Sequence, residues 1–152
     1  MIVAATLLLG TYDYNGAGMH VIERAMSGEA APAAFILKLA FTAVTLAAGF
    51  KGGEIVPAFF VGSTFGCVMA PILGLDPAFG AAIGFVALFC GVVNCPLASI
   101  VLSVEVFGSK GLLFFAVACG ISYMLSGYFG LYGSQRFLYS KTTNEIIDTK
   151  IE

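Results

Sequence analysis

The residues best placed for chemistry lie in one short segment, residues 49–57, which reads Gly-Phe-Lys-Gly-Gly-Glu-Ile-Val-Pro. Its glycines let the backbone bend and approach a ligand closely, and Pro57 is tolerated in the first turn of a helix. The amides at the start of such a helix have no partner within the helix and carry a partial positive charge. The segment therefore predicts an anion-binding site made of backbone N–H groups.

An uninterrupted apolar run, Ala58 to Leu73, follows this segment. A helix from Glu54 to Leu73 is about long enough to cross most of a hydrocarbon core of roughly 30 Å, at ~1.5 Å per residue. The anion site would then lie inside a membrane. A glycine-interrupted apolar segment whose helix end faces a ligand at membrane depth is typical of an ion transporter.

Three charged residues have two interpretations each. Two of them, Lys51 and Glu54, lie within this segment, and Lys38 lies upstream of it. Glu54 either stabilises the first helical turn or competes with the anion and takes a proton as the anion enters. Lys51 either pairs with Glu54 or concentrates anions at the mouth of a pathway. Lys38, in the middle of an apolar helix, either attracts anions or pairs with backbone carbonyls at a helix end or with a carboxylate, and the pairing is favoured.

The composition places the chain in lipid. Its hydrophobic fraction is 59% and its charged fraction 11%, whereas soluble domains are about half apolar and a quarter charged. A net charge of −2 excludes a basic nucleic-acid surface. The four cysteines lack CxxC spacing, which argues against zinc and redox sites. No metal and no cofactor are indicated.

The remaining pattern predicts an all-α membrane protein with broken and half-length helices, which are tolerated at membrane depth only when they are buried in protein or line a cavity. Besides the helix from Glu54 to Leu73, helices are expected at residues 19–26, 33–48, 78–93, 97–106, 112–126 and about 131–140. Residues 1–9 are expected to end a helix that begins upstream. Asp76 is the expected N-cap of the segment at 78–93, and Asn94-Cys95-Pro96 is the expected break after it.

Four motifs resemble the CLC family of chloride channels and anion/proton exchangers. Gly53–Pro57 resembles its GxFxP element, with Ile55 in place of the usual Phe. The second motif is Pro96–Leu102 with Glu105 three residues later, which is similar to the PLTGIxLxxE helix. The third is Gly130-Leu131-Tyr132, which is similar to the segment of the last-helix tyrosine, and the fourth is Lys38 within Leu37–Thr42. Their order and spacing resemble the C-terminal half of a CLC transmembrane domain over residues 1–141, with residues 142–152 as a frayed cytosolic tail.

The resemblance implies the site residues. In the family, backbone amides at the start of the GxFxP helix bind the anion, which corresponds here to Gly53, Glu54 and Ile55, and the last-helix tyrosine, here Tyr132, donates its hydroxyl. The segment that carries Glu54 resembles that of the bacterial branch of the family that exchanges fluoride for protons, in which an acidic residue is characteristic at this position. That branch is expected to carry a hydroxyl residue two positions later, where this chain has Val56.

The implied function is fluoride export coupled to proton entry by a homodimer in the bacterial plasma membrane, with the C-terminus in the cytoplasm, where basic residues such as Arg136 and Lys141 are favoured. The alternative within the family is a chloride channel or chloride/proton exchanger. The GSGIP-type and GREGP-type elements of the family's first half do not occur here, so transport is expected only together with an N-terminal half.

An intramembrane hydrolase is disfavoured because the sole histidine, His20, lies outside any predicted span, so no enzyme is expected. A non-transporting membrane subunit is the remaining alternative.

Overall fold

The computed structural model describes residues 6–7, 10–50, 52–143 and 145–150. Most of the expected N-terminal helix end and Lys51 thus lie outside the described residues. The chain divides into two compact units, one up to Phe85 and one from Val86 onward.

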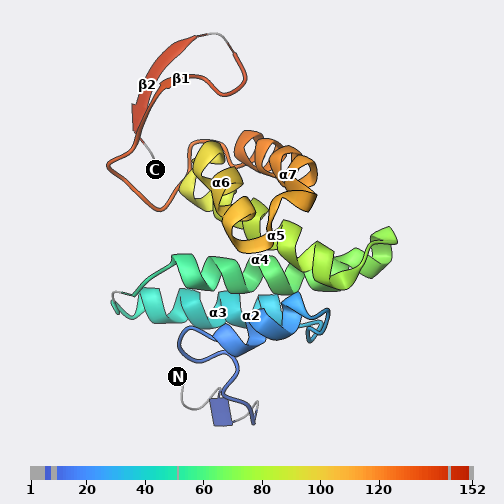
Figure 1. Ribbon diagram of the computed structural model, residues 1–152. Coiled ribbons are helices and arrows are strands. Elements are labelled where there is room, and N and C mark those ends of the chain that lie inside the picture. The colour runs from blue at the N-terminus through green and yellow to red at the C-terminus, as the bar shows by residue number, and fades with distance from the viewer. Residues whose placement is uncertain (1–5, 8–9, 51, 144, 151–152) are drawn as a thin grey trace. The chain divides into compact units, whose positions relative to one another are not determined.

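In the first unit, two helices pack on a third. Helix α2 (Met19–Met26) and helix α3 (Ala34–Ala47) both contact α4 (Ile55–Met69), as Figure 1 shows. The 3₁₀ turn η1 (Ala70–Leu73) continues α4. These elements confirm the expected helices at 19–26, 33–48 and 54–73. Of the described residues, only Ile55–Leu73 form a helix long and apolar enough to cross a membrane, by length and composition.

Helix α5 (Pro77–Val93) begins in the first unit, where glycines bring it into backbone contact with α4. A Cβ atom on Gly84 would lie 2.2 Å from the carbonyl oxygen of Gly62. The ring of Phe59 stacks on that of Phe85 beside this contact, at 3.9 Å between centroids. The glycines four apart, Gly62 and Gly66 on α4 and Gly80 and Gly84 on α5, therefore mark a close helix crossing.

Both ends of α5 follow the sequence expectation. The backbone N–H of Phe79 donates to Asp76 Oδ2 at 3.0 Å, which confirms Asp76 as the helix cap. The helix stops before Asn94, whose φ of 56° is left-handed. Asparagine tolerates this conformation better than most residues do. The next helix, α6, starts at Pro96, where a proline costs no hydrogen bond.

In the second unit, α6 (Pro96–Phe107) packs on α7 (Leu112–Leu125), and the short 3₁₀ turn η2 (Ser109–Gly111) joins them. The hydroxyl of Ser122 on α7 donates to the carbonyl of Ala87 at 2.6 Å, which ties α7 to the part of α5 in this unit. These helices confirm the segments expected at 97–106 and 112–126.

The helix expected at about 131–140 is wrong. Strand β1 (Arg136–Tyr139) pairs there with antiparallel strand β2 (Ile146–Lys150), so residues of the expected frayed tail also form a strand. Glycines at 130 and 133 disfavour a helix, and aromatic residues at 137 and 139 favour a strand. The fold is therefore helical with one two-stranded hairpin at its end.

Candidate anion site at the start of α4

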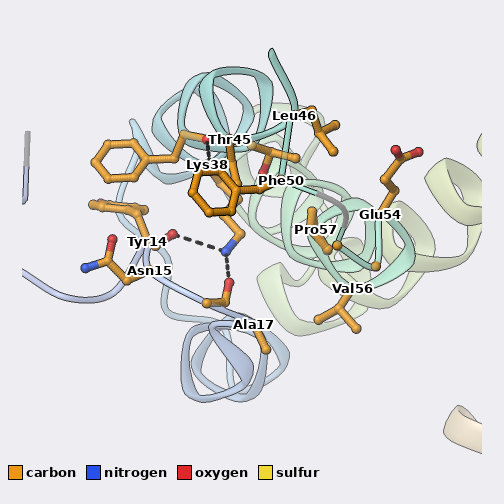
Figure 2. Close-up of a pocket in the computed structure, with 15 residues that line it drawn as sticks. Tyr14, Asn15, Ala17, Lys38, Thr45, Leu46, Phe50, Glu54, Val56 and Pro57 are labelled. Carbon is orange, nitrogen blue, oxygen red and sulfur yellow. Dashed lines mark hydrogen bonds between the residues drawn. The ribbon is translucent and has the colours of Figure 1, made fainter. Parts of the chain in front are cut away.

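A cavity of about 580 Å³ lies at the start of α4 in the first unit. Its walls come from residues 14–17 of the loop before α2, one face of α3, Phe50, and residues 52–57 without Ile55 (Figure 2). Its lining residues with polar side chains are Tyr14, Asn15, Lys38, Thr42, Thr45 and Glu54. The cavity thus joins the predicted helix start to side chains that can bind an anion or carry charge.

The start of α4 offers unpaired backbone amides. The first hydrogen bond of the helix runs from the N–H of Ala58 to the carbonyl of Glu54, at 3.1 Å. The amides of Ile55 and Val56 precede it and have no acceptor within the helix. No side chain caps this end among the described residues. Gly53 and Glu54 line the cavity, whereas Ile55 is half-buried and is not one of its lining residues.

The Glu54 side chain is half-buried, and within the described part of the chain it has no ion pair or hydrogen bond. Figure 2 shows its carboxylate turned away from the Lys38 ammonium. Lys51, the predicted partner of a local ion pair with Glu54, lies outside the described residues. A carboxylate without a fixed partner at a cavity wall can exchange a proton without breaking structural contacts.

Lys38 is 2% exposed, and its ammonium is held by the loop opposite. Its Nζ donates to the carbonyl of Gly16 at 2.6 Å and to that of Tyr14 at 3.2 Å, and it lies 5.0 Å from the ring centroid of Phe60. The predicted pairing with backbone carbonyls is confirmed, although these carbonyls belong to a loop rather than to a helix end. No carboxylate among the described residues pairs with Lys38, so its ammonium is held at the cavity wall by backbone carbonyls.

Glycines let the loop of residues 10–18 reach Lys38. Gly16 and Gly18 have φ of 58° and 70°, in the left-handed region. A Cβ atom on Gly18 would also lie 2.8 Å from the ring of Phe60. The Tyr14 ring packs near those of Phe41 and Phe60, at centroid distances of 6.1 and 6.3 Å. Close aromatic packing and the lysine thus hold the loop in place.

Sequence reasoning did not select the hydroxyl groups of this cavity. Thr42 and Thr45 lie on the same face of α3 as Lys38, at helical spacing. Thr45 Oγ1 donates to the carbonyl of Phe41 at 2.7 Å. The Thr42 hydroxyl lines the cavity with no hydrogen bond to any described residue. The spacing of 38, 42 and 45 in the sequence was the available signal.

The structure brings Gly53, Glu54 and Lys38 together around this cavity in the first unit, whereas Tyr132 belongs to the second unit. It is 46% exposed and lies in the connection between α7 and β1. The expected position at a helix start is wrong, since the helix itself is absent there.

The helical fold, with a helix long and apolar enough to span a membrane and a cavity at the start of that helix, is typical of a membrane transport protein. A family model described as "Voltage gated chloride channel" matches residues 1–127. The chain belongs to this family, which confirms the CLC resemblance, and with the candidate span Ile55–Leu73 it is an integral membrane protein. The match ends before Tyr132, so the assignment of that residue rests on the sequence motif alone.

Two individual proteins are similar to this chain. A "Chloride/fluoride channel protein" of Pseudomonas syringae pv. tomato is 44% identical over 128 residues, which are 84% of this chain and 28% of the relative. The crystal structure of a CLC-type fluoride/proton antiporter matches with a TM-score of 0.81 and 34% identity, over 86% of this chain and 33% of that one. The CLC-type fold is thus confirmed, and the chain spans about a third or less of these relatives.

Proposed function

We propose that this chain supplies the C-terminal part of a CLC-type fluoride exporter that exchanges fluoride for protons and acts only together with an N-terminal half. The observation that carries this proposal is the cavity at the start of α4, which Glu54 lines at the helix start and Lys38 from α3. The anion would meet unpaired amides, the Lys38 ammonium would lie nearby with two of its donors taken by backbone carbonyls, and a carboxylate without a partner among the described residues would stand beside it.

The proposed exchange depends on competition at the helix start. Amide dipoles attract an anion without a full positive charge that would trap it. A negative Glu54 carboxylate repels the same anion. Protonation of Glu54 removes this repulsion, so entry of an anion favours uptake of a proton, and loss of the anion favours its release. Proton binding and anion binding would thereby be linked at this helix start, and the opposite directions of the two movements would come from the complete protein.

Fluoride is favoured over chloride as the substrate for two reasons. Glu54 stands where chloride-handling members carry an apolar residue, according to the motif resemblance. The matching crystal structure is described as a fluoride/proton antiporter. The description of the Pseudomonas relative names both halides, and a chloride channel or chloride/proton exchanger is therefore the alternative.

The deciding experiment is flux from liposomes. The longer protein that contains this chain and the chain alone are reconstituted separately, and fluoride and chloride efflux are followed with ion-selective electrodes together with internal pH. The proposal expects fluoride efflux with internal acidification for the longer protein only. Chloride efflux without fluoride efflux supports the alternative, and fluoride efflux from the chain alone contradicts the need for an N-terminal half.

We also propose that the protein is a homodimer with its C-terminus in the cytoplasm. Helix α6 leaves Leu97 and Val101 exposed, which suits contact with a second copy. Arg136 and Lys141 follow the last apolar helix, and basic residues favour the cytoplasmic side. Cross-linking in native membranes tests the dimer. Labelling of a cysteine placed at residue 142 in sealed cells tests the orientation.

A further inference from the structure

In the second unit, the ammonium of Lys141 lies in a small polar pocket beyond the last helix. Its Nζ donates to the carbonyl of Tyr123 at 2.9 Å, to Ser126 Oγ at 3.0 Å and to Asn94 Oδ1. An ammonium has three N–H donors and no acceptor. Each of these donors is therefore matched by one acceptor.

Aromatic rings surround the same ammonium. Its Nζ lies 4.1 Å from the ring centroid of Tyr123, 5.0 Å from that of Phe137 and 6.0 Å from that of Tyr128. The negative faces of such rings attract cations, and groups of several rings are used to recognise ammonium ligands. Three oxygen acceptors and three rings around one nitrogen are the geometry of a binding site for an ammonium group.

The acceptors are held by contacts that do not involve Lys141. Asn94 is 4% exposed and its backbone is in the left-handed conformation. Its side-chain amide nitrogen donates to the carbonyl of Phe129. Ser126 Oγ donates to Asn94 Oδ1 at 2.8 Å. Burial lowers the pKa of Lys141, and the acceptors and rings oppose this effect by stabilising the charged form. The pocket is therefore built for a cation before the lysine enters it.

We propose that Asn94, Tyr123, Ser126 and Phe137 form an ammonium-binding site, which Lys141 fills from within the chain and which takes a free primary alkylammonium ion when that side chain is removed. The filled site fastens the segment that carries β1 to the break between α5 and α6. The hydroxyl of Tyr128 supports this attachment, since it donates to Ser140 Oγ at 3.1 Å and accepts from the backbone N–H of Lys141 at 3.1 Å.

The test replaces the lysine and supplies its missing part from solution. In Lys141→Ala, n-propylammonium matches the lost three carbons and ammonium. Thermal unfolding of the detergent-purified chain is measured with propylammonium chloride, with n-propanol and with sodium chloride at equal ionic strength. We expect a lower Tm for Lys141→Ala, restored saturably by propylammonium and not by propanol, and no response to propylammonium from the unaltered chain.

Lys110, an exposed lysine in η2 of the same unit, provides the matched control. Lys110→Ala should show no gain with propylammonium beyond that of the unaltered chain. Equal gains with propanol and propylammonium, or none with either, would overturn the proposal, because long lysine side chains also stabilise proteins by packing their stems.

A second measurement needs no variant and decides the matter if Lys141→Ala does not fold. The unaltered chain is treated with an amine-acetylating reagent, and the modified lysines are followed by mass spectrometry over time. We expect Lys141 to react about tenfold more slowly than Lys110, because a cation held by hydrogen bonds and rings is not available to the reagent. Equal rates for the two lysines would overturn the proposal.

Discussion

The carbonyl oxygen of Gly80 lies 2.1 Å from the point that a Cβ atom on Gly66 would occupy. Helices α4 and α5 therefore touch through their backbones at this crossing. In lipid, where water exclusion between helices is absent, such close packing is a main source of helix association. The contact helps to hold α4, and with it the helix start that lines the cavity.

Replacing Gly66 by alanine should therefore destabilise the chain. The added methyl group meets backbone atoms of α5, which cannot move aside as a side chain could, and overpacking typically costs about 1–3 kcal/mol. Denaturant unfolding in detergent measures the change. Gly120→Ala is the control, since nothing lies within 4 Å of its Cβ position. That change should be neutral or stabilising, because alanine favours the helix over glycine by about 1 kcal/mol.

Lys38→Met tests how the loop of residues 10–18 is held. Methionine keeps much of the apolar stem but leaves the carbonyls of Gly16 and Tyr14 without their donor. Gly16 is exposed and Tyr14 half-buried, so water can replace part of each lost hydrogen bond, which is worth about 0.5–1.5 kcal/mol. We expect a loss of stability of this order and faster proteolysis within the loop. Lys110→Met, at an exposed position, should leave both unchanged, and loop cleavage at the original rate in Lys38→Met would show that the lysine does not hold the loop.

Glu54→Gln separates a role in transport from a role in folding. The carboxylate has no hydrogen bond or ion pair with any described residue, so the free energy of unfolding should change by about 0.5 kcal/mol or less. In the longer protein, fluoride flux should lose its dependence on proton movement, because glutamine cannot take up or release a proton. Internal pH and fluoride are recorded together in liposomes. Glu105→Gln, exposed on α6, is the control and should leave coupling intact.

Most helices of this fold could be predicted because long apolar runs with clear breaks leave few alternatives. Pro57, Asp76 and Asn94 each mark a helix boundary by local chemistry, and the structure places all three as predicted. The segment after Gly130 was mispredicted because the family resemblance suggested a helix, whereas its own residues favour a strand.

The cavity could be predicted only in part. Glycines and a proline in residues 49–57 indicate a helix start with free amides, and Glu54 follows from its position there. The loop that supplies Tyr14 and the carbonyl of Gly16 lies more than twenty residues before Lys38 of α3 in the sequence. Its contact with Lys38 therefore depends on tertiary packing. Thr42 lines the cavity because of how α3 is oriented in the tertiary structure, and no sequence motif marks it.

An ion pair network outside the apolar helices makes stability depend on pH. Asp13 Oδ1 lies 2.8 Å from His20 Nε2, and Asp13 Oδ2 accepts a hydrogen bond from Arg24 Nη2 at 2.7 Å. The hydrogen bond with His20, followed by that with Arg24, holds the pKa of Asp13 below its ordinary value of 3.8. The folded chain therefore binds fewer protons at this carboxyl than the unfolded chain does.

Asp13→Asn should remove this pH dependence. A carboxyl whose pKa is lowered by folding stabilises the folded state above its unfolded pKa, and the stabilisation is lost as the pH falls through the folded pKa. The unaltered chain should thus be more stable than Asp13→Asn at about pH 5, by about 1 kcal/mol or less since the pair is exposed. The difference should shrink below the ordinary value of 3.8. Glu23→Gln, on α2 between His20 and Arg24, is the control for unfolding measured across this range. A pH-independent difference between the unaltered chain and Asp13→Asn would exclude the network as its source.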